Sequence, residues 1–387
     1  MSIHQSETIP GIRRGNRQRM NAIHCINCHL QYPDTDIPYR CPRCGGLFDF
    51  EALWSFDPSQ VDSGQPGIWR YRHTFGLPDD APTISLGEGN TPLLWAQAFG
   101  KKVAFKCEYL NPSGSFKDRG SVPLVSFIRS RGVESAVEDS SGNAGASFAA
   151  YAARAGLKAQ VYIPDSASGP KRRQIEAYGA EVVRIMGPRS NAAEAVRRVA
   201  DQGAVYASHA YLPFNLPGYA TIAYEIVEQL NGAPGTLITP VGQGGLLLGV
   251  ARGFQALQEA GAISKMPVLI GVQARACSPL WALYNYGSTG LGWSVEGQTL
   301  AEGIRVFPPL RGDSVLRAMT ANQGIFLAVD EEDILPGREA LAHLGFYVEP
   351  TSAVIWSALE QLAGRMPDPV VVLLTGSGFK WIGTAAN

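Results

Sequence analysis

The stretch Ser113-Gly114-Ser115-Phe116-Lys117-Asp118-Arg119-Gly120 sets a lysine into a short Ser/Gly turn just before an apolar helical segment. Two further turns of small residues follow strand-like segments: Ser140-Ser141-Gly142-Asn143-Ala144-Gly145 and, far downstream, Gly242-Gln243-Gly244-Gly245. A Gly-rich turn that leads from a strand into a helix presents backbone N–H groups to an anion. A lone lysine in a loop is usually a solvated charge. A lysine accompanied by two such turns indicates a reactive amine beside a cradle for a phosphorylated group.

These features favour pyridoxal 5'-phosphate (PLP) as the cofactor. PLP chemistry needs a lysine amine that binds the cofactor covalently and moves protons at substrate carbons. It also needs N–H donors for the cofactor phosphate and a partner for the pyridine nitrogen.

Short β-branched runs alternate with segments of helical spacing over most of the chain. The predicted strands are residues 102–106, 136–138, 159–163, 181–185, 204–207, 236–241, 268–273 and 370–374. The clearest helical segments are residues 144–155, 191–200 and 221–230. Such alternation predicts an α/β fold with mostly parallel sheets covered by helices on both faces. The uninterrupted apolar run 370–374 is typical of a strand buried on both faces.

The composition sets limits on the class of protein. The chain has 387 residues, a formal net charge of −1, 45% hydrophobic and 17% charged residues. These values are ordinary for a folded protein of two or three domains, and they give no reason to expect nucleic acid or an anionic membrane as a partner. Residues 1–20 lack the apolar core of a signal peptide, and no apolar run is long enough to span a membrane. We therefore expect a cytoplasmic protein.

Four of the six cysteines form two CxxC pairs near the start of the chain, Cys25/Cys28 and Cys41/Cys44. Two such turns can close a tetrahedral four-thiolate site, which suits structural zinc, with iron as the alternative metal. The haem-attachment pattern CxxCH also fits Cys25 to His29, but it leaves Cys41 and Cys44 unexplained and requires an export signal. The isolated Cys107 and Cys277 are interpreted as buried small hydrophobes.

Five segments in order resemble the fold-type II PLP-dependent enzymes, and within them the threonine synthases. They are residues 86–93, 111–120, 140–145, 240–245 and 374–378. The resemblance implies two doubly wound open-sheet domains like those of the tryptophan synthase β chain, preceded here by a small zinc ribbon. The expected division is a flexible arm (1–20), a zinc-ribbon-like module (21–52), a connector with the start of the larger domain (53–100), a smaller domain (101–208) and a larger domain (209–387).

The resemblance also implies roles for single residues. Lys117 would be catalytic and carry the Schiff base to the cofactor. The other cofactor-binding residues would be Asn143 at the 3'-oxygen, Gly242, Gln243, Gly244 and Gly245 at the phosphate, and Thr375 at the pyridine nitrogen. Substrate contacts would come from Ser115, Ser141, Gly142, Ala144, His209 and Asn215, with Asp118 near the site. The metal ligands would be Cys25, Cys28, Cys41 and Cys44.

The chain departs from threonine synthases where they hold the substrate phosphate. An Asn-Ser pair of the family becomes His209-Ala210, and a nearby arginine becomes Asn215. Loss of a bidentate Arg–phosphate contact weakens phosphate binding roughly tenfold to a hundredfold. Either a protonated His209 or the basic residues 171–173 could compensate, although we interpret the basic residues as a solvated helix face.

The implied function is a PLP-dependent lyase that converts O-phosphohomoserine and water to threonine and phosphate, as a homodimer acting on a small amino acid. Threonine or serine deamination and β-replacement on an activated serine are alternatives on the same scaffold, and a non-enzymatic binding role is a third. Glu349 is either a helix cap or a site residue, Asp118 and Arg119 either a charge pair or site residues, and His343 is expected on a helix surface.

Overall fold

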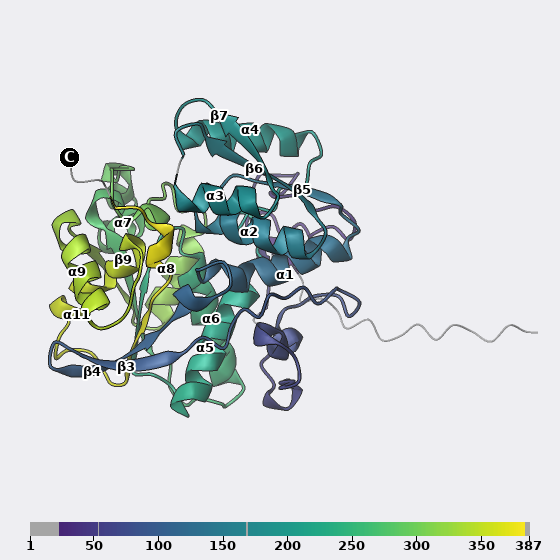
Figure 1. The fold of residues 1–387 in the computed structure, drawn as a ribbon. Coiled ribbons are helices and arrows are strands. Elements are labelled where there is room, and N and C mark those ends of the chain that lie inside the picture. The colour runs from purple at the N-terminus through teal and green to yellow at the C-terminus, as the bar shows by residue number, and fades with distance from the viewer. Residues whose placement is uncertain (1–22, 53, 168, 384–387) are drawn as a thin grey trace, which may run out of the picture.

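The computed structural model describes residues 23–52, 54–167 and 169–383, and it confirms the α/β class. In these residues the chain forms a six-stranded sheet, a three-stranded sheet and a two-stranded sheet. Figure 1 shows the six-stranded and the three-stranded sheet with their helices. The expected arm at residues 1–20 lies outside the described residues.

The six-stranded sheet has the order β10-β9-β8-β11-β4-β3. Its strands are β3 (Leu93–Ala98), β4 (Lys101–Lys106), β8 (Thr236–Pro240), β9 (Val268–Ala274), β10 (Ile325–Val329) and β11 (Val370–Leu373). All neighbours are parallel except β3 and β4. The predicted strand with both faces buried is confirmed: it is β11, which lies between β8 and β4, and every residue of it is buried. β4 belongs to this sheet, whereas the expected domain boundary at residue 101 would group it with the smaller one.

The three-stranded parallel sheet has the order β5-β6-β7 and is surrounded by the first four helices (Figure 1). Its elements are β5 (Ser135–Glu138), β6 (Lys158–Pro164), β7 (Glu181–Ile185), α1 (Lys117–Ser130), α2 (Asn143–Arg154), α3 (Pro170–Ala177) and α4 (Arg189–Asp201). The strand predicted at 204–207 is wrong in extent. Only a single bridge forms there, between Tyr206 and Val137, because the chain turns away from the sheet immediately afterwards.

Seven helices accompany the larger sheet in the described part of the chain. They are α5 (Leu216–Leu230), α6 (Gly245–Glu259), α7 (Pro279–Trp293), α8 (Gly312–Ala321), α9 (Glu331–His343), α10 (Pro350–Ala353) and α11 (Ile355–Gln361). Short 3-10 turns lie at Pro58–Gln60, Gly67–Thr74, Glu108–Leu110, Arg275–Cys277, Glu302–Ile304 and Gly378–Lys380. His343 is exposed at the end of α9, as predicted. Cys107 and Cys277 are fully buried, also as predicted.

A buried ionic network holds the start of α1 against the larger sheet and α5. Arg119 donates to Glu108 at 2.7 Å and to Glu225 at 2.7 Å, and Lys106 lies 2.6 Å from Glu225. Neighbouring cations keep the pKa of Glu225 well below its usual range against the opposing effect of burial. Arg119 therefore does not pair with Asp118; it anchors the helix that carries Lys117. Removing one partner of such a buried network is strongly destabilising.

The Cys-rich module contains β1 (Ile23–Cys25) and β2 (Phe48–Phe50), which pair antiparallel. Its aromatic residue Tyr32 packs edge-on against Phe127 of α1 and Phe214 before α5. Asp49 accepts two hydrogen bonds from Arg252 of α6, at 2.7 and 2.8 Å. The module is thus fixed to the body of the molecule by apolar packing and by a paired carboxylate.

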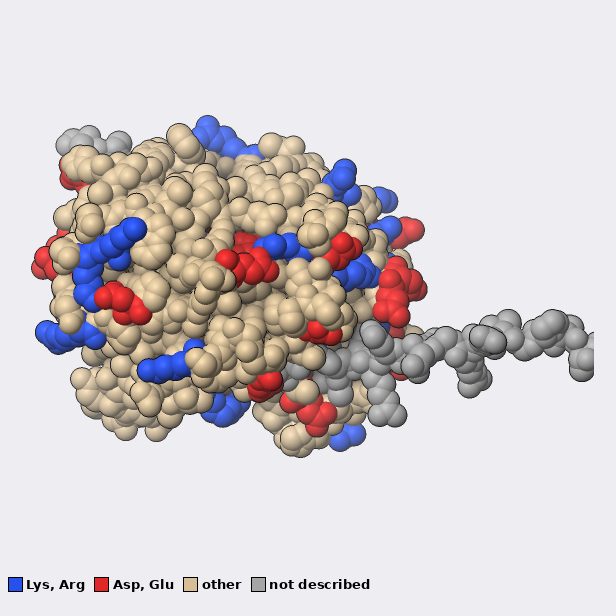
Figure 2. Space-filling model, turned by 90° about the horizontal axis from the view of Figure 1, so that it is seen from below, with Lys and Arg blue, Asp and Glu red and all other residues tan. Residues whose placement is uncertain are grey.

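The surface carries both signs of charge. Figure 2 shows Lys and Arg interspersed with Asp and Glu over one face, without a large field of a single sign. Among the described residues, no helix combines the length and the apolar character needed to cross a bilayer.

Candidate active site

A cavity of about 1160 Å³ is lined by all three small-residue turns. Of the predicted site residues, those that line it are Lys117, Ser141, Gly142, Asn143, Ala144, His209, Gly242, Gln243, Gly244, Gly245 and Thr375. The turns meet because each follows a strand at the carboxyl edge of its sheet, where open α/β sheets bind ligands. The structure therefore brings together residues that are separated by most of the chain.

Lys117 begins α1 and reaches the cavity from the turn that the sequence singled out. Burial lowers the pKa of its amine from 10.5 to about 8, although Glu138 acts in the opposite direction. The turn is held by Asp118, which accepts from the Ser113 backbone N–H at 2.6 Å and from its hydroxyl at 2.5 Å. Lys380 donates to the Ser113 carbonyl at 2.8 Å. The amine is thus positioned and more easily deprotonated than a surface lysine.

The second turn connects the two sides of the cavity. α2 begins at Asn143, whose amide donates to Glu349 Oε1 at 2.6 Å, while Lys171 of α3 lies 2.8 Å from Glu349 Oε2. The side chain of Glu349 makes no cap hydrogen bond to α10, so its role is in this cluster. The interpretation of Lys171 as part of a solvated face is wrong, because its side chain is only 12% exposed and lines the cavity.

The third turn leads from β8 into α6 and presents unused donors. Among the described residues, none of the backbone N–H groups of residues 242–245 donates to a protein acceptor. Gly244 has φ +87°, and a Cβ there would lie 2.5 Å from Val315 Cγ2. Glycine is therefore required at this position for conformation and for space.

Thr375 lies at the floor of the cavity, directly after β11. Its hydroxyl is 3.0 Å from Ser352 Oγ, which also accepts from the backbone N–H groups of Thr375 and Gly376 at 3.0 and 2.8 Å. Ser352, which the sequence analysis did not single out as a site residue, therefore orients the threonine hydroxyl.

Two predicted substrate-binding residues do not line the cavity. Ser115 is fully buried in the lysine-bearing turn, and its hydroxyl has no partner in the described part of the chain. Asn215 is buried behind His209 and donates to its carbonyl oxygen at 2.6 Å. In this conformation Asn215 supports His209 and is not itself at the cavity wall.

Several charged residues at or beside the cavity were not predicted, among them Glu138 and Arg189. Glu138, at the end of β5, lies with its Oε1 2.7 Å from His209 Nδ1. Arg189, at the start of α4, lines the cavity. A polar residue at the carboxyl end of a parallel strand was the available signal for Glu138. No pattern in the sequence distinguished Arg189 from other surface arginines.

Comparison with known proteins identifies the family. A protein-family model described as "Pyridoxal-phosphate dependent enzyme" matches residues 84–376 of the sequence. The chain belongs to this family. Curated relatives include the threonine synthase of Methanocaldococcus jannaschii, 33% identical over 374 residues, with 92% of each chain covered. The threonine synthase of Synechocystis sp. is 35% identical over 330 residues, covering 81% of this chain and 82% of its own.

Solved structures show the same fold. A T.th. threonine deaminase superposes with a TM-score of 0.62 at 27% identity, covering 76% of this chain and 94% of its own. A maize serine racemase gives a TM-score of 0.65 at 22% identity, covering 74% and 88%. The chain is thus a PLP-dependent enzyme, as the sequence motifs predicted.

The residues of the cavity fit PLP. The free N–H groups of residues 242–245 match a phosphate dianion at a helix start. The Oδ1 atom of Asn143 is buried and has no hydrogen-bond partner among the residues that the structure describes, so a bound group can supply one. The amine of Lys117, with its pKa near 8, suits covalent attachment to an aldehyde.

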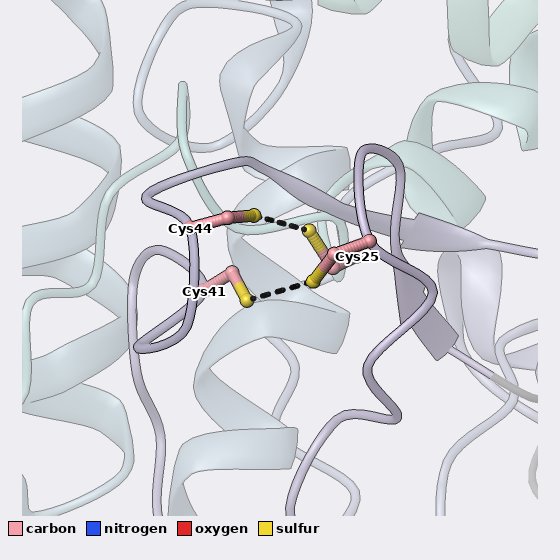
Figure 3. Close-up of side chains that lie close together, drawn as sticks. Cys25, Cys41 and Cys44 are labelled. Atoms are coloured by element: carbon pink, nitrogen blue, oxygen red, sulfur yellow. Dashed lines mark hydrogen bonds between the residues drawn. The ribbon is translucent and has the colours of Figure 1, made fainter.

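The four cysteines of the module converge as predicted from their spacing. Their Sγ atoms all lie within 4.8 Å of one another, with Cys25 and Cys44 at 3.4 Å and Cys28 and Cys41 at 3.6 Å (Figure 3). Four sulfurs about 2.3 Å from a shared centre, as in structural zinc sites, have separations of this size. The arrangement therefore fits a tetrahedral metal ion.

Proposed function

We propose that this PLP-dependent lyase converts O-phosphohomoserine and water to threonine and phosphate. The observation that carries the proposal is a second set of cations in the cavity, separate from the glycine-rich turn. This set contains Arg172 and Arg173 of α3 and Arg189 of α4, and it lies beside Lys171, whose ammonium is paired with Glu349. A substrate with its own phosphate needs such a set, because the amides of residues 242–245 serve the cofactor. The similarity to threonine synthases over nearly the whole chain supports the same reaction.

The chain's own residues have distinct tasks in this reaction. Bound PLP supplies the electron sink that acidifies protons on the substrate carbons next to its amino group. Lys117 removes the Cα and Cβ protons in turn. Protons are then returned to Cγ, which becomes the methyl carbon once phosphate has left, and to Cα. Ser141 and its turn hold the substrate carboxylate, and Asn143 and Thr375 orient the cofactor ring. A hydroxyl at Thr375 cannot keep the pyridine nitrogen protonated as a carboxylate would, which suits elimination and addition more than transamination.

In this proposal Arg189 replaces the arginine that threonine synthases have at the position of Asn215. It begins α4, on the rim of the cavity formed by the smaller sheet. In this proposal its guanidinium binds the substrate phosphate. A cytoplasmic homodimer acting on a small amino acid is part of the same proposal.

The test uses purified, PLP-loaded protein given O-phosphohomoserine, with phosphate and threonine measured together. We expect equimolar release of both, and a rise in KM of roughly tenfold to a hundredfold for Arg189→Met. Arg198→Met is the matched control, because Arg198 lies on the same helix and pairs with Glu194 on the exposed surface. Absence of phosphate release by the unmodified enzyme would contradict the proposal.

Deamination of threonine or serine is the second candidate. The observation that favours it is the loss of the Asn-Ser pair with which threonine synthases hold the substrate phosphate: His209-Ala210 stands there, and His209 is paired with Glu138. The fold similarity to a threonine deaminase is consistent with it. Formation of a 2-oxoacid from threonine or serine, with no turnover of O-phosphohomoserine, would establish this reaction instead.

We also propose that Cys25, Cys28, Cys41 and Cys44 hold a structural Zn²⁺. The module is too small to fold on its apolar core alone, and a metal ion would supply the missing stabilisation. Metal analysis of the purified protein tests this, with one zinc per chain as the expected result and iron as the competing one.

A further inference from the structure

A buried glutamate and a histidine form a pair at the cavity wall beside Lys117. Glu138 is 1% exposed, and its Oε1 lies 2.7 Å from His209 Nδ1. Its Oε2 accepts from the backbone N–H of Asp139. The backbone of His209 is held in turn by Asn215, whose amide donates to the His209 carbonyl at 2.6 Å. Both the ring and the segment that carries it are therefore fixed.

The second ring nitrogen of His209 is left for the cavity. His209 lines the cavity, and its Nε2 makes no hydrogen bond within the described residues. The charged groups that face the imidazole are Glu138 and Asp139 from the end of β5, Lys117 from α1 and Arg189 from α4. The pair thus presents one ring nitrogen to a bound molecule and uses the other for orientation.

The environment makes the imidazole neutral near pH 7. Burial, assisted by the charge of Lys117, holds the pKa of His209 well below its usual value, and Asp139 opposes this only in part. A neutral imidazole carries one N–H. Burial raises the pKa of the Glu138 carboxyl, whereas the hydrogen bond from Asp139 and the charges of Lys117 and Arg189 favour its ionised form. With the imidazole N–H on Nδ1 donating to that carboxylate, Nε2 has a free lone pair. Such a nitrogen accepts a hydrogen bond from water or a hydroxyl and cannot donate one to a phosphate oxygen.

We propose that His209 is a second proton-transfer residue, which activates the water molecule that adds to the substrate, and that Glu138 is its positioning residue. The inference rests on the proposed function, whose hydration step requires a base. An O–H bond of water breaks and its proton goes to Nε2, while a C–O bond forms at Cβ. The electron pair of the substrate's Cα–Cβ double bond moves to Cα, where Lys117 returns a proton. The imidazolium later releases its proton to solvent.

Separate roles for Lys117 and His209 explain why a histidine occupies a position at which threonine synthases bind the substrate phosphate. Lys117 is occupied with the carbon-bound protons, and a single amine cannot hold a water molecule for Cβ at the same time. The cations of α3 and α4 then bind the substrate phosphate, and the Glu138–His209 pair binds and activates the water molecule.

The test compares His209→Asn and Glu138→Gln with His343→Gln, a control at an exposed histidine of α9. Each PLP-loaded variant is given O-phosphohomoserine, and phosphate, threonine and 2-oxobutanoate are measured. Without water activation the eliminated but unhydrated product leaves and hydrolyses to 2-oxobutanoate and ammonia. We expect His209→Asn to release phosphate while the ratio of threonine to 2-oxobutanoate falls at least about tenfold. Glu138→Gln should move this ratio in the same direction, and the control should leave it unchanged.

A second measurement does not depend on turnover. Nitrogen-15 NMR of the histidine rings in the PLP-loaded protein should show His209 neutral, with the proton on Nδ1, and Glu138→Gln should reduce that tautomeric preference. A proton on Nε2 in the unmodified protein, or an unchanged product ratio in His209→Asn, would overturn the inference while leaving the proposed function intact. If His209→Asn fails to fold, the ratio of threonine to 2-oxobutanoate in Glu138→Gln is the test: a lower ratio supports the inference and an unchanged ratio overturns it. Absence of phosphate release by the unmodified enzyme would overturn the proposed function, and the inference with it.

Discussion

The ammonium of Lys171 lies 2.8 Å from Glu349 Oε2, and this contact joins the two sides of the active-site cavity. Lys171 belongs to α3 beside the three-stranded sheet, and Glu349 precedes α10 beside the six-stranded sheet. Glu349 also accepts from Asn143, so one carboxylate links two elements of the smaller sheet to the larger. This carboxylate is therefore one of the contacts that set the relative position of the two sheets and the shape of the cavity between them.

Replacing Lys171 with methionine should therefore destabilise the protein. The change leaves Glu349, which is 1% exposed, as a buried carboxylate without its cation. Removing one partner of a buried ion pair lowers the free energy of unfolding by about 3–5 kcal/mol. Because Lys171 is partly exposed, we expect a loss at the lower end of this range, about 3 kcal/mol. The measurement is the free energy of unfolding in urea. Arg172→Met is the matched control, because Arg172 pairs loosely with Glu176 at 3.5 Å and its loss should cost less than about 1 kcal/mol. An equal decrease in the free energy of unfolding for both variants would show that the Lys171–Glu349 pair does not stabilise the protein more than an exposed pair does.

The lowered pKa of Lys117 should be visible in the pH dependence of PLP binding. The amine attacks an aldehyde only when it is uncharged, and burial lowers its pKa to about 8. The rate at which the cofactor-free protein forms its covalent bond to PLP should therefore increase with pH along a titration curve. The midpoint of this curve should lie near pH 8, with a plateau at higher pH. Stopped-flow absorbance follows the reaction. Lys117→Ala should bind PLP without the absorbance change, and a midpoint near 10.5 for the unmodified protein would contradict the prediction.

Gly244→Ala should weaken PLP binding. The new Cβ would lie 2.5 Å from Val315 Cγ2, at a residue with φ +87°, so the turn must change shape. Charge-assisted hydrogen bonds from its N–H groups are worth on the order of 1.5–3 kcal/mol each, and losing one should raise the Kd for PLP roughly tenfold to a hundredfold. Titration of the cofactor-free protein by fluorescence measures this. Gly292→Ala is the control, since a Cβ there meets no atom within 4 Å. An unchanged Kd for PLP in Gly244→Ala would show that this turn does not bind the cofactor phosphate.

Local motifs predicted the fold class and the three turns that meet at the cavity. Each motif sits where a strand ends, and the carboxyl edges of parallel strands converge on one place whatever the length of chain between them. Residues that depend on tertiary packing were not predictable in this way. Lys171 has the sequence context of a solvated helix residue, and only its contact with Glu349 reveals otherwise. Likewise Asn215 looks like a substrate ligand in the alignment of motifs but lies behind His209 in the fold.

The zinc proposal predicts that Cys41→Ser both empties the metal site and loosens the module. Three thiolates bind zinc more weakly than four, and the free energy of metal binding is also folding free energy for a module of this size. The module is packed through Tyr32 against α1 and through Asp49 against α6, so its loosening should extend to the body of the enzyme. We expect zinc content to fall from one per chain to nearly none and the midpoint of thermal unfolding to decrease. Cys277→Ala, at a buried cysteine outside the cluster, should keep its zinc. Full zinc content in Cys41→Ser would show that the metal is held elsewhere.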